Sequence, residues 1–296
     1  MVFCFVTFKT QERIATYMKN QLKTVALLGL LTFLAMWIGT LFGQGGVIIA
    51  LVIVVAMNFG MYFFSDKLAL KMYKAQPASK TDYPRLHALV EEVATKADIP
   101  KPEVYIINSA TPNAFATGRN PQNGKVAFTT GIMSLLTERE LKGVIAHEIA
   151  HIKNRDILIT TIAATIGGLI SYLATMAQWA AIFGGFGNRD GGPNILQLLV
   201  LIIVAPLLAM LIRMAISRAR EYYADQEGAS YINDPEALAS ALNKLEHGVQ
   251  ARPLRGAPEG GESLFIVNPF RADKMVNLFS THPATEERVK RLRAQN

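Results

Sequence analysis

Three long windows of this 296-residue chain contain no charged residue: residues 24–65, 157–188 and 191–212. The 30 basic and 23 acidic residues all lie outside these windows, where they make up about a quarter of the sequence, the usual share in a soluble domain. A helix that crosses the hydrocarbon core of a bilayer needs about 20 apolar residues. We therefore expect an ordinary globular protein that is interrupted by membrane segments.

The charge-free windows are long enough for two helical hairpins. In the first, the apolar stretches 25–42 and 47–64 are separated by residues 43–46, of sequence GQGG, which predict a turn. In the second, the stretches 157–183 and 195–212 are joined by a glycine-rich link. The stretch 157–183 also contains several threonines and glycines, so a long helix buried against protein is the alternative to a membrane span there.

Basic residues flank the outer ends of both hairpins. Lys23 precedes the first hairpin and Lys67 follows it, while Arg155 precedes the second and Arg213 follows it. Cytoplasmic flanks of membrane helices carry an excess of lysine and arginine, so we expect both termini and the globular part in the cytoplasm. The expected organisation is a basic cytoplasmic N-terminus (1–23), a first hairpin (24–65), a first globular part (66–156), a second hairpin (157–212) and a second globular part (213–296).

The overall charge agrees with this arrangement. The net charge is +7 and the pI is near 9.4, and we attribute both to the basic flanks rather than to nucleic-acid binding. The single cysteine, Cys4, excludes an intrachain disulfide, which suits a reducing compartment.

The globular parts are expected to be mainly helical with a small β-sheet. Residues 113–117 and 126–129 flank a stretch rich in glycine, asparagine and proline, which predicts a β-hairpin. Residues 137–140 (TERE) form a capping box and predict the start of a helix. The other expected elements are a strand at 104–107, a helix from the second hairpin to about residue 230, and helices at 84–97, 235–248 and 283–294.

The helix opened by the capping box carries the motif HEIAH, in which His147 and His151 flank Glu148. Residues four apart lie on one face of a helix, so both imidazoles can bind one metal ion, and Zn²⁺ accepts neutral histidine nitrogens. Glu148 lies beside the first histidine and can take a proton from the attacking water. The motif predicts half of a metalloprotease site.

A catalytic zinc ion needs a third protein ligand, for which Glu221 is the best candidate. Glu221 and Asp225 are four residues apart on the helix that follows the second hairpin. Asp225 would then hold a histidine ligand by accepting its second N–H. The alternative is a solvated acidic face, since Glu227 and Glu236 lie nearby.

These features resemble the HtpX family of membrane-bound bacterial zinc metalloproteases, which are relatives of the CAAX prenyl protease. The resemblance extends from about Met18 to the C-terminus. The matching motifs are the N-terminal hairpin, residues 113–116 (NAFA), the HEIAH motif, Glu221 with Asp225, and residues 281–283 (THP). The resemblance implies an α+β membrane protein with four transmembrane helices and a mainly helical, gluzincin-like protease domain that carries a small β-sheet.

The resemblance also implies a role for each matching residue. His147, His151 and Glu221 would bind one zinc ion, Glu148 would be the catalytic base, and His282 would stabilise the transition state. An edge strand that binds substrate would be formed by Asn113, Ala114, Phe115 and Ala116.

The function implied is endopeptidase cleavage of damaged or misfolded membrane proteins at the cytoplasmic face of the bacterial inner membrane, in quality control and the stress response. One apolar hairpin separates His151 from Glu221, so we expect the zinc site within roughly 10–15 Å of the membrane face. Two alternatives stay open: a four-helix membrane scaffold or channel with a structural zinc site, and a prenyl-protein protease. The sequence does not define the substrate or the oligomeric state.

Overall fold

The computed structural model describes residues 43–158, 218–251 and 283–295, together with isolated positions between residues 22 and 40. Its sheet has four strands in the order β1-β2-β4-β3. Strand β2 pairs parallel with β4, and β1 and β3 pair antiparallel with their neighbours. The antiparallel pairing of β3 with β4 confirms the predicted hairpin. The strands are β1 (Gln76–Pro77), β2 (Glu103–Ile107), β3 (Ala114–Thr117) and β4 (Lys125–Thr129).

The two faces of the sheet are covered by different helices, because successive side chains of a strand point to opposite faces. On one face, Val104, Val126 and Phe128 belong to the main core together with α3 (Pro84–Lys96) and α5 (Glu138–Lys153). The other face carries a smaller core, in which Ile107, Phe115 and Ala127 contact Ala69 and Leu70. The sheet therefore lies between α5 and the end of α2 (Gly43–Met72).

Helix α5 begins as the sequence predicts. The Thr137 hydroxyl accepts from the Glu140 amide, and the Glu140 carboxylate accepts from the Thr137 amide, which completes the capping box. The buried Glu140 carboxylate also accepts from Ser240 and Lys244 of α10 (Pro235–Ala251). One residue thus sets the start of α5 and ties it to another helix.

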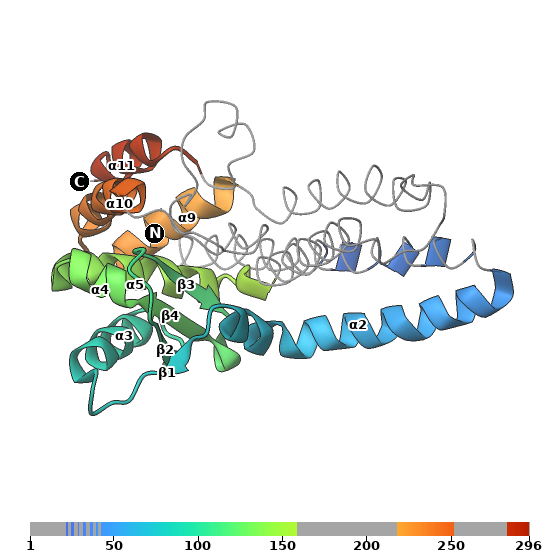
Figure 1. The fold of residues 1–296 in the computed structure, drawn as a ribbon. Coiled ribbons are helices and arrows are strands. Elements are labelled where there is room, and N and C mark those ends of the chain that lie inside the picture. The colour runs from blue at the N-terminus through green and yellow to red at the C-terminus, as the bar shows by residue number, and fades with distance from the viewer. Residues whose placement is uncertain are drawn as a thin grey trace, which may run out of the picture.

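Two helices from the C-terminal part of the chain, α9 (Arg218–Ile232) and α10, pack on the side of α5 that faces away from the sheet (Figure 1). The last helix, α11 (Thr285–Arg293), packs in turn on α9 and α10. Glycine lets α9 approach α5 closely: a Cβ atom on Gly228 would lie 2.8 Å from the backbone of Ala146 and His147. This contact brings α9 next to the HEIAH motif. The described chain also contains α4 (Thr130–Leu135) and a short 3₁₀ turn (Pro121–Asn123).

Replacing Gly228 with alanine is expected to destabilise the protein by about 1–3 kcal/mol, the usual cost of overpacking a core, and to weaken metal binding. The added methyl group would clash with backbone atoms, which cannot rotate away as a side chain can, so α9 must move away from α5. Thermal unfolding and metal content measure both effects. Gly60→Ala is the matched control, since a Cβ at this helical glycine meets nothing within 4 Å; equal effects of the two substitutions would contradict the close helix contact.

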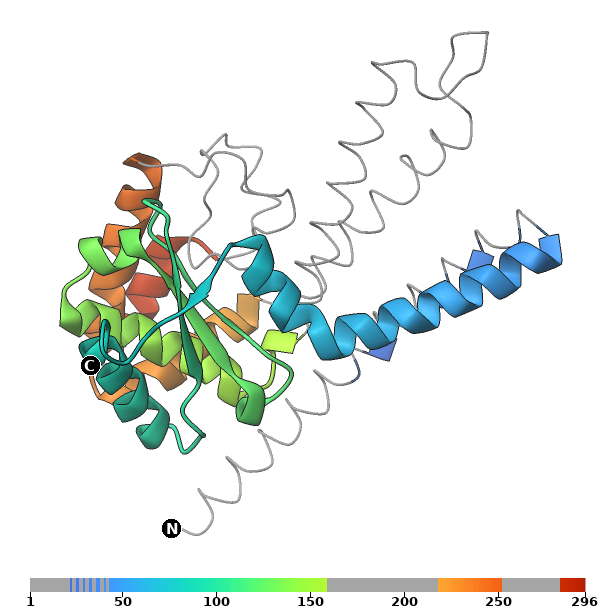
Figure 2. The same ribbon diagram turned by 60° about the horizontal axis from the view of Figure 1, so that its bottom comes forward.

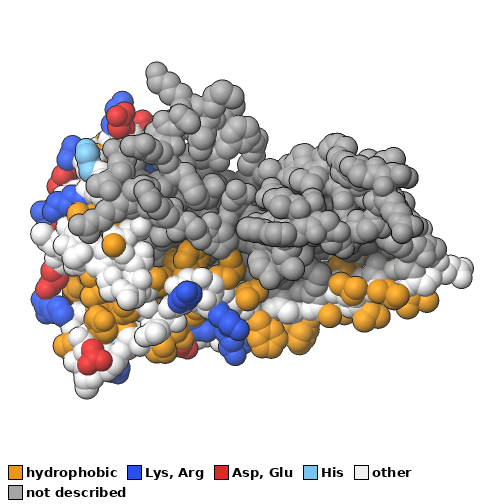
Figure 3. All heavy atoms as spheres, viewed as in Figure 1, with side chains coloured by type: hydrophobic (Ala, Val, Ile, Leu, Met, Phe, Trp, Pro, Cys, Tyr) orange, Lys and Arg blue, Asp and Glu red, His pale blue; other side chains and the backbone are white. Residues whose placement is uncertain are grey.

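Helix α2 has 30 residues and extends away from the sheet (Figures 1 and 2). Large apolar side chains lie exposed along it: Ile48, Ile49 and Val52 are 63%, 62% and 65% exposed, and Figure 3 shows a band of such side chains on this helix. Within the described residues, no helix combines the length and the hydropathy of a membrane span.

One expectation about this region is wrong. Residues 43–46 are the first turn of α2 rather than a separate turn, since glycine is tolerated where a helix begins. The helix also continues beyond the apolar stretch to Met72, because Ala69 and Leu70 pack on the sheet. The second hairpin expected at 157–212 lies almost entirely outside the described residues.

Candidate metal centre

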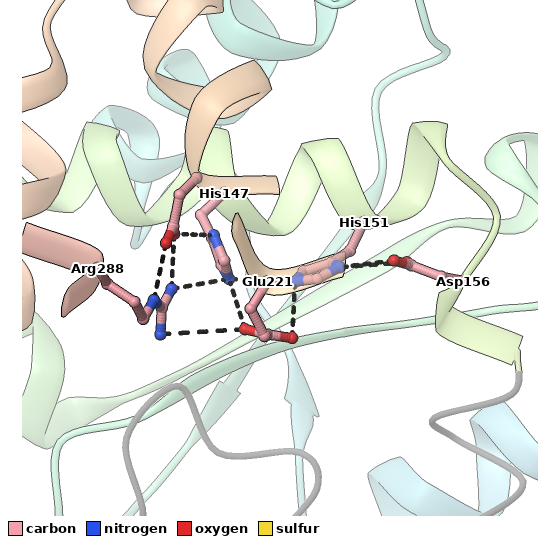
Figure 4. A network of polar contacts seen from close by, with 6 residues as sticks. His147, His151, Asp156, Glu221 and Arg288 are labelled. Atoms are coloured by element: carbon pink, nitrogen blue, oxygen red, sulfur yellow. Dashed lines mark hydrogen bonds and ion pairs between the residues drawn. The ribbon is translucent and has the colours of Figure 1, made fainter. Parts of the chain in front are cut away.

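Helices α5 and α9 bring three potential metal ligands together. The Nε2 atoms of His147 and His151 lie 3.1 Å apart on one face of α5. The two carboxylate oxygens of Glu221, in the first turn of α9, lie 3.6 Å from these nitrogens, one from each. Figure 4 shows the three side chains converging.

The spacing of these atoms fits one metal ion. All three ligand atoms lie within 4.8 Å of one another. A tetrahedral zinc ion with nitrogen and oxygen ligands at about 2.0–2.1 Å holds its ligand atoms about 3.3–3.4 Å apart. The observed separations of 3.1 and 3.6 Å bracket that value. Two imidazoles and a carboxylate are also a usual donor set of catalytic zinc, which keeps a further position open.

A carboxylate holds the outer nitrogen of each histidine. Asp225 of α9 lies 2.9 Å from Nδ1 of His147. Asp156 lies 3.0 Å from Nδ1 of His151. Such contacts fix the ring orientation and direct the inner nitrogen to the metal.

Asp156 was not among the residues predicted from the sequence. The residue follows the end of α5, where Arg155 adopts φ 56°, the left-handed conformation that turns a chain back at the end of a helix. That turn returns the Asp156 carboxylate to His151 (Figure 4). An acid a few residues beyond a metal-binding helix is the signal that could have identified it.

Arg288 of α11 is the second residue that sequence reasoning missed. Its side chain is only 1% exposed, and its guanidinium donates to both oxygens of Asp225 at 2.7 and 2.8 Å. It also lies 3.9 Å from Glu221 and 3.4 Å from Nε2 of His147. A buried positive charge therefore stands at the edge of the candidate metal site.

These charges shift the pKa values of the site. Burial disfavours the protonated form of His151, but the carboxylates of Asp156 and Glu221 outweigh it and raise its pKa to about 10. Burial and carboxylate contacts oppose each other at His147 too, and the net effect is a raised pKa. Burial would raise the pKa of Asp225, but the charge and hydrogen bonds of Arg288 lower it to about 2. Asp225 is therefore ionised at neutral pH.

Glu148 lies beside the metal ligands and against the sheet. Its side chain is buried, and burial raises the pKa of its carboxyl. The carboxylate accepts a hydrogen bond from the backbone N–H of Ala116 in β3. A carboxyl with a raised pKa next to metal ligands has the properties of a proton acceptor and donor.

Strand β3 lies at the edge of the sheet, and it contains Ala114, Phe115 and Ala116. Asn113 directly precedes it and is held by Thr129, whose hydroxyl accepts from the Asn113 amide at 2.9 Å. The geometry thus places the four residues of the NAFA motif at one edge, beside Glu148. His282 lies outside the described residues.

Comparison with known proteins identifies the family of this chain. The model of peptidase family M48 matches residues 80–296. The chain belongs to peptidase family M48. Curated relatives named "Protease HtpX homolog" are 49% identical in Syntrophobacter fumaroxidans and 51% identical in Pyrococcus furiosus, over 94% and 92% of this chain and 100% and 94% of the relatives. Membership in the HtpX group of M48 makes the chain a zinc metalloprotease.

A solved structure shows the same fold in a more distant protein. The crystal structure of S. mikatae Ste24p aligns with 94% of this M48 chain and 67% of its own, with a TM-score of 0.51 and 17% identity. At this identity the likeness concerns the fold alone, and it agrees with a mainly helical protease domain that contains a small sheet.

Metal affinity of this M48 protease is expected to fall as the pH is lowered. In the metal-free protein, the pKa of about 10 keeps His151 protonated near neutral pH, and the pKa of His147 is also raised. A metal ion must displace the proton from each imidazole that it binds. The proton displaced from His151 alone weakens binding about tenfold per pH unit below its pKa, and the raised pKa of His147 adds to this slope as the pH is lowered. Competition with a chelator of known affinity at pH 6, 7 and 8 measures the slope; an affinity independent of pH would contradict the assignment.

Proposed function

We propose that this chain is a membrane-bound zinc endopeptidase in which His147, His151 and Glu221 hold a single zinc ion. The observation that carries the proposal is the convergence of these three ligands beside a buried glutamate, Glu148, which contacts an edge strand. A structural zinc site is usually closed by four protein ligands. The cluster here has three ligands and a carboxylate next to it, which favours catalysis.

Each residue of the site has a defined part in this proposal. A bound zinc ion supplies Lewis-acid polarisation of the scissile carbonyl and acidifies water. Glu148 accepts the proton of the attacking water and delivers it to the leaving amine. Asp225 and Asp156 hold the two imidazoles in orientation. His282 is proposed to stabilise the oxyanion.

Strand β3 is proposed to bind the substrate. Within the described part of the chain, β3 has a neighbouring strand on one side only. An extended peptide can add to such an edge through main-chain hydrogen bonds, which tolerate many side chains. The Ala116 amide that contacts Glu148 belongs to this strand, so a peptide on β3 would lie beside the proton acceptor.

The membrane part of the proposal rests on the charge-free windows of the sequence and on the exposed apolar side chains of α2. Glu221 follows the window 191–212 by about nine residues, which would span roughly 14 Å if the connection is helical. The site would then face the cytoplasmic surface of the bacterial inner membrane. Damaged or misfolded membrane proteins are the proposed substrates, in quality control during stress.

Cleavage by the full-length protein in vesicles tests the proposal. We expect cleavage of membrane-protein substrates that stops with a chelator and resumes when zinc is added. Retained zinc without cleavage of any substrate would favour the scaffold with a structural site. Cleavage restricted to peptides with a prenylated cysteine would favour a prenyl-protein protease.

A further inference from the structure

The end of α2 changes abruptly from apolar to basic. The exposed apolar side chains end with Phe63 and Phe64. Lys67 and Lys71 then follow on the helix, both exposed and one helical turn apart. Between residues 62 and 80 the sequence has four lysines and a single acid, Asp66. Figure 3 shows basic side chains gathered at the point where the apolar band of α2 meets the sheet.

Two cations at this boundary stack on aromatic rings. The Lys67 ammonium lies 5.6 Å from the centre of the Phe64 ring, and the Arg119 guanidinium lies 5.4 Å from the centre of the Phe63 ring. Arg119 comes from the connection between β3 and β4, so the contact joins α2 to this hairpin. Lys67, Lys71 and Arg119 are here called the basic collar.

The carboxylate nearest to the collar in the sequence, that of Asp66, already forms an ion pair with another residue. Asp66 lies 2.5 Å from the ammonium group of Lys125, at the start of β4, and both side chains are largely buried. Within the described residues, neither Lys67 nor Lys71 forms an ion pair. The collar therefore offers positive charge to a partner outside the chain, at the edge of an apolar helix surface.

The collar is connected to the proposed substrate strand. Phe115 of β3 packs on Tyr73, with ring centres 5.3 Å apart, and it shares a core with Ala69 and Leu70 of α2. The next residue, Ala116, donates to Glu148. The end of α2 thus supports β3 from the face opposite to the metal centre.

We propose that the basic collar binds the headgroups of anionic phospholipids and thereby holds the β3–β4 hairpin against α2. The proposal rests on the proposed function, in which the apolar part of α2 lies in a bilayer. A bilayer matches both chemistries of the site, because apolar chains would contact residues 48–64 while phosphates contact the cations. A soluble anion would leave the apolar surface uncovered.

Lipid selectivity in vesicles tests the collar directly. The full-length protein is reconstituted with spin-labelled phosphatidylglycerol or spin-labelled phosphatidylcholine, and the immobilised fraction of each is compared. We expect wild type to prefer phosphatidylglycerol by about twofold or more, and the triple variant Lys67→Gln, Lys71→Gln, Arg119→Gln to lose this preference. Cleavage of a soluble unstructured peptide should rise with phosphatidylglycerol content in wild type and stay constant in the variant.

Two controls keep the outcomes separate. Lys80→Gln removes an exposed lysine in the connection between β1 and α3. This connection points away from α2 (Figure 1), so the variant should retain the preference for phosphatidylglycerol. Zinc content and activity in phosphatidylcholine vesicles show that the triple variant is folded. Equal association of both lipids with wild type, or a preference that persists in the triple variant, overturns the collar. Failure of the protein to float with vesicles overturns the proposed membrane location instead.

Discussion

Glu148→Gln is expected to lower the turnover number of peptide cleavage by about 10²–10⁴-fold, the contribution of a positioned general base, while zinc stays bound. Glutamine keeps the shape of the side chain and can still accept from the Ala116 amide, but it cannot take a proton. The three converging ligands are unchanged. Two quantities are measured: the rate at which a membrane-protein substrate is cleaved, and the zinc content per protein molecule.

The matched control for this substitution is Glu138→Gln on the same helix. Glu138 is exposed and pairs with Arg85 at the start of α5, so its loss should leave turnover within about twofold, as for other exposed ion pairs. A Glu148→Gln enzyme that retained zinc and full turnover would refute the assignment of the base. Loss of zinc together with activity would show that Glu148 supports the ligands instead.

The local features of the site could be predicted from the sequence because each is set by neighbouring residues. The capping box at Thr137 and Glu140 determines where α5 begins, and helical spacing then puts His147 and His151 on one face. The β3–β4 hairpin follows from the turn residues between its strands. Asp225 was predicted by the same four-residue spacing from Glu221.

The rest depends on contacts between distant parts of the chain. Arg288 is 141 residues from His147, and its helix also contains Lys290, Arg291 and Arg293. Nothing in the order of these four cations shows which one is buried. The end of α2 also depends on a distant contact. The helix continues to Met72 because Ala69 and Leu70 pack on the face of the sheet opposite to α5.

Arg288→Met is expected to destabilise the protein by about 3–5 kcal/mol, the usual cost of leaving one partner of a buried ion pair alone, and to weaken zinc binding by roughly 10–100-fold. Methionine keeps the unbranched apolar part of the side chain but leaves the buried carboxylate of Asp225 without its two guanidinium bonds. Asp225 then holds His147 less firmly. Thermal unfolding and zinc competition measure the two losses.

A second substitution, at Asp225, shows whether Arg288 stabilises the protein through its ion pair or through packing alone. Adding Asp225→Asn removes the buried negative charge, so the double variant should lose less stability than the sum of the two single variants. Arg293→Met is the matched control on the same helix: its guanidinium pairs with Glu236 at the surface, where both side chains are exposed, and such pairs contribute about 0–1 kcal/mol. Additive losses in the double variant would mean that Arg288 acts through its packing alone. A coupling between the two residues would instead show that α11, the last helix of the chain, stabilises the metal centre by holding Asp225 against His147.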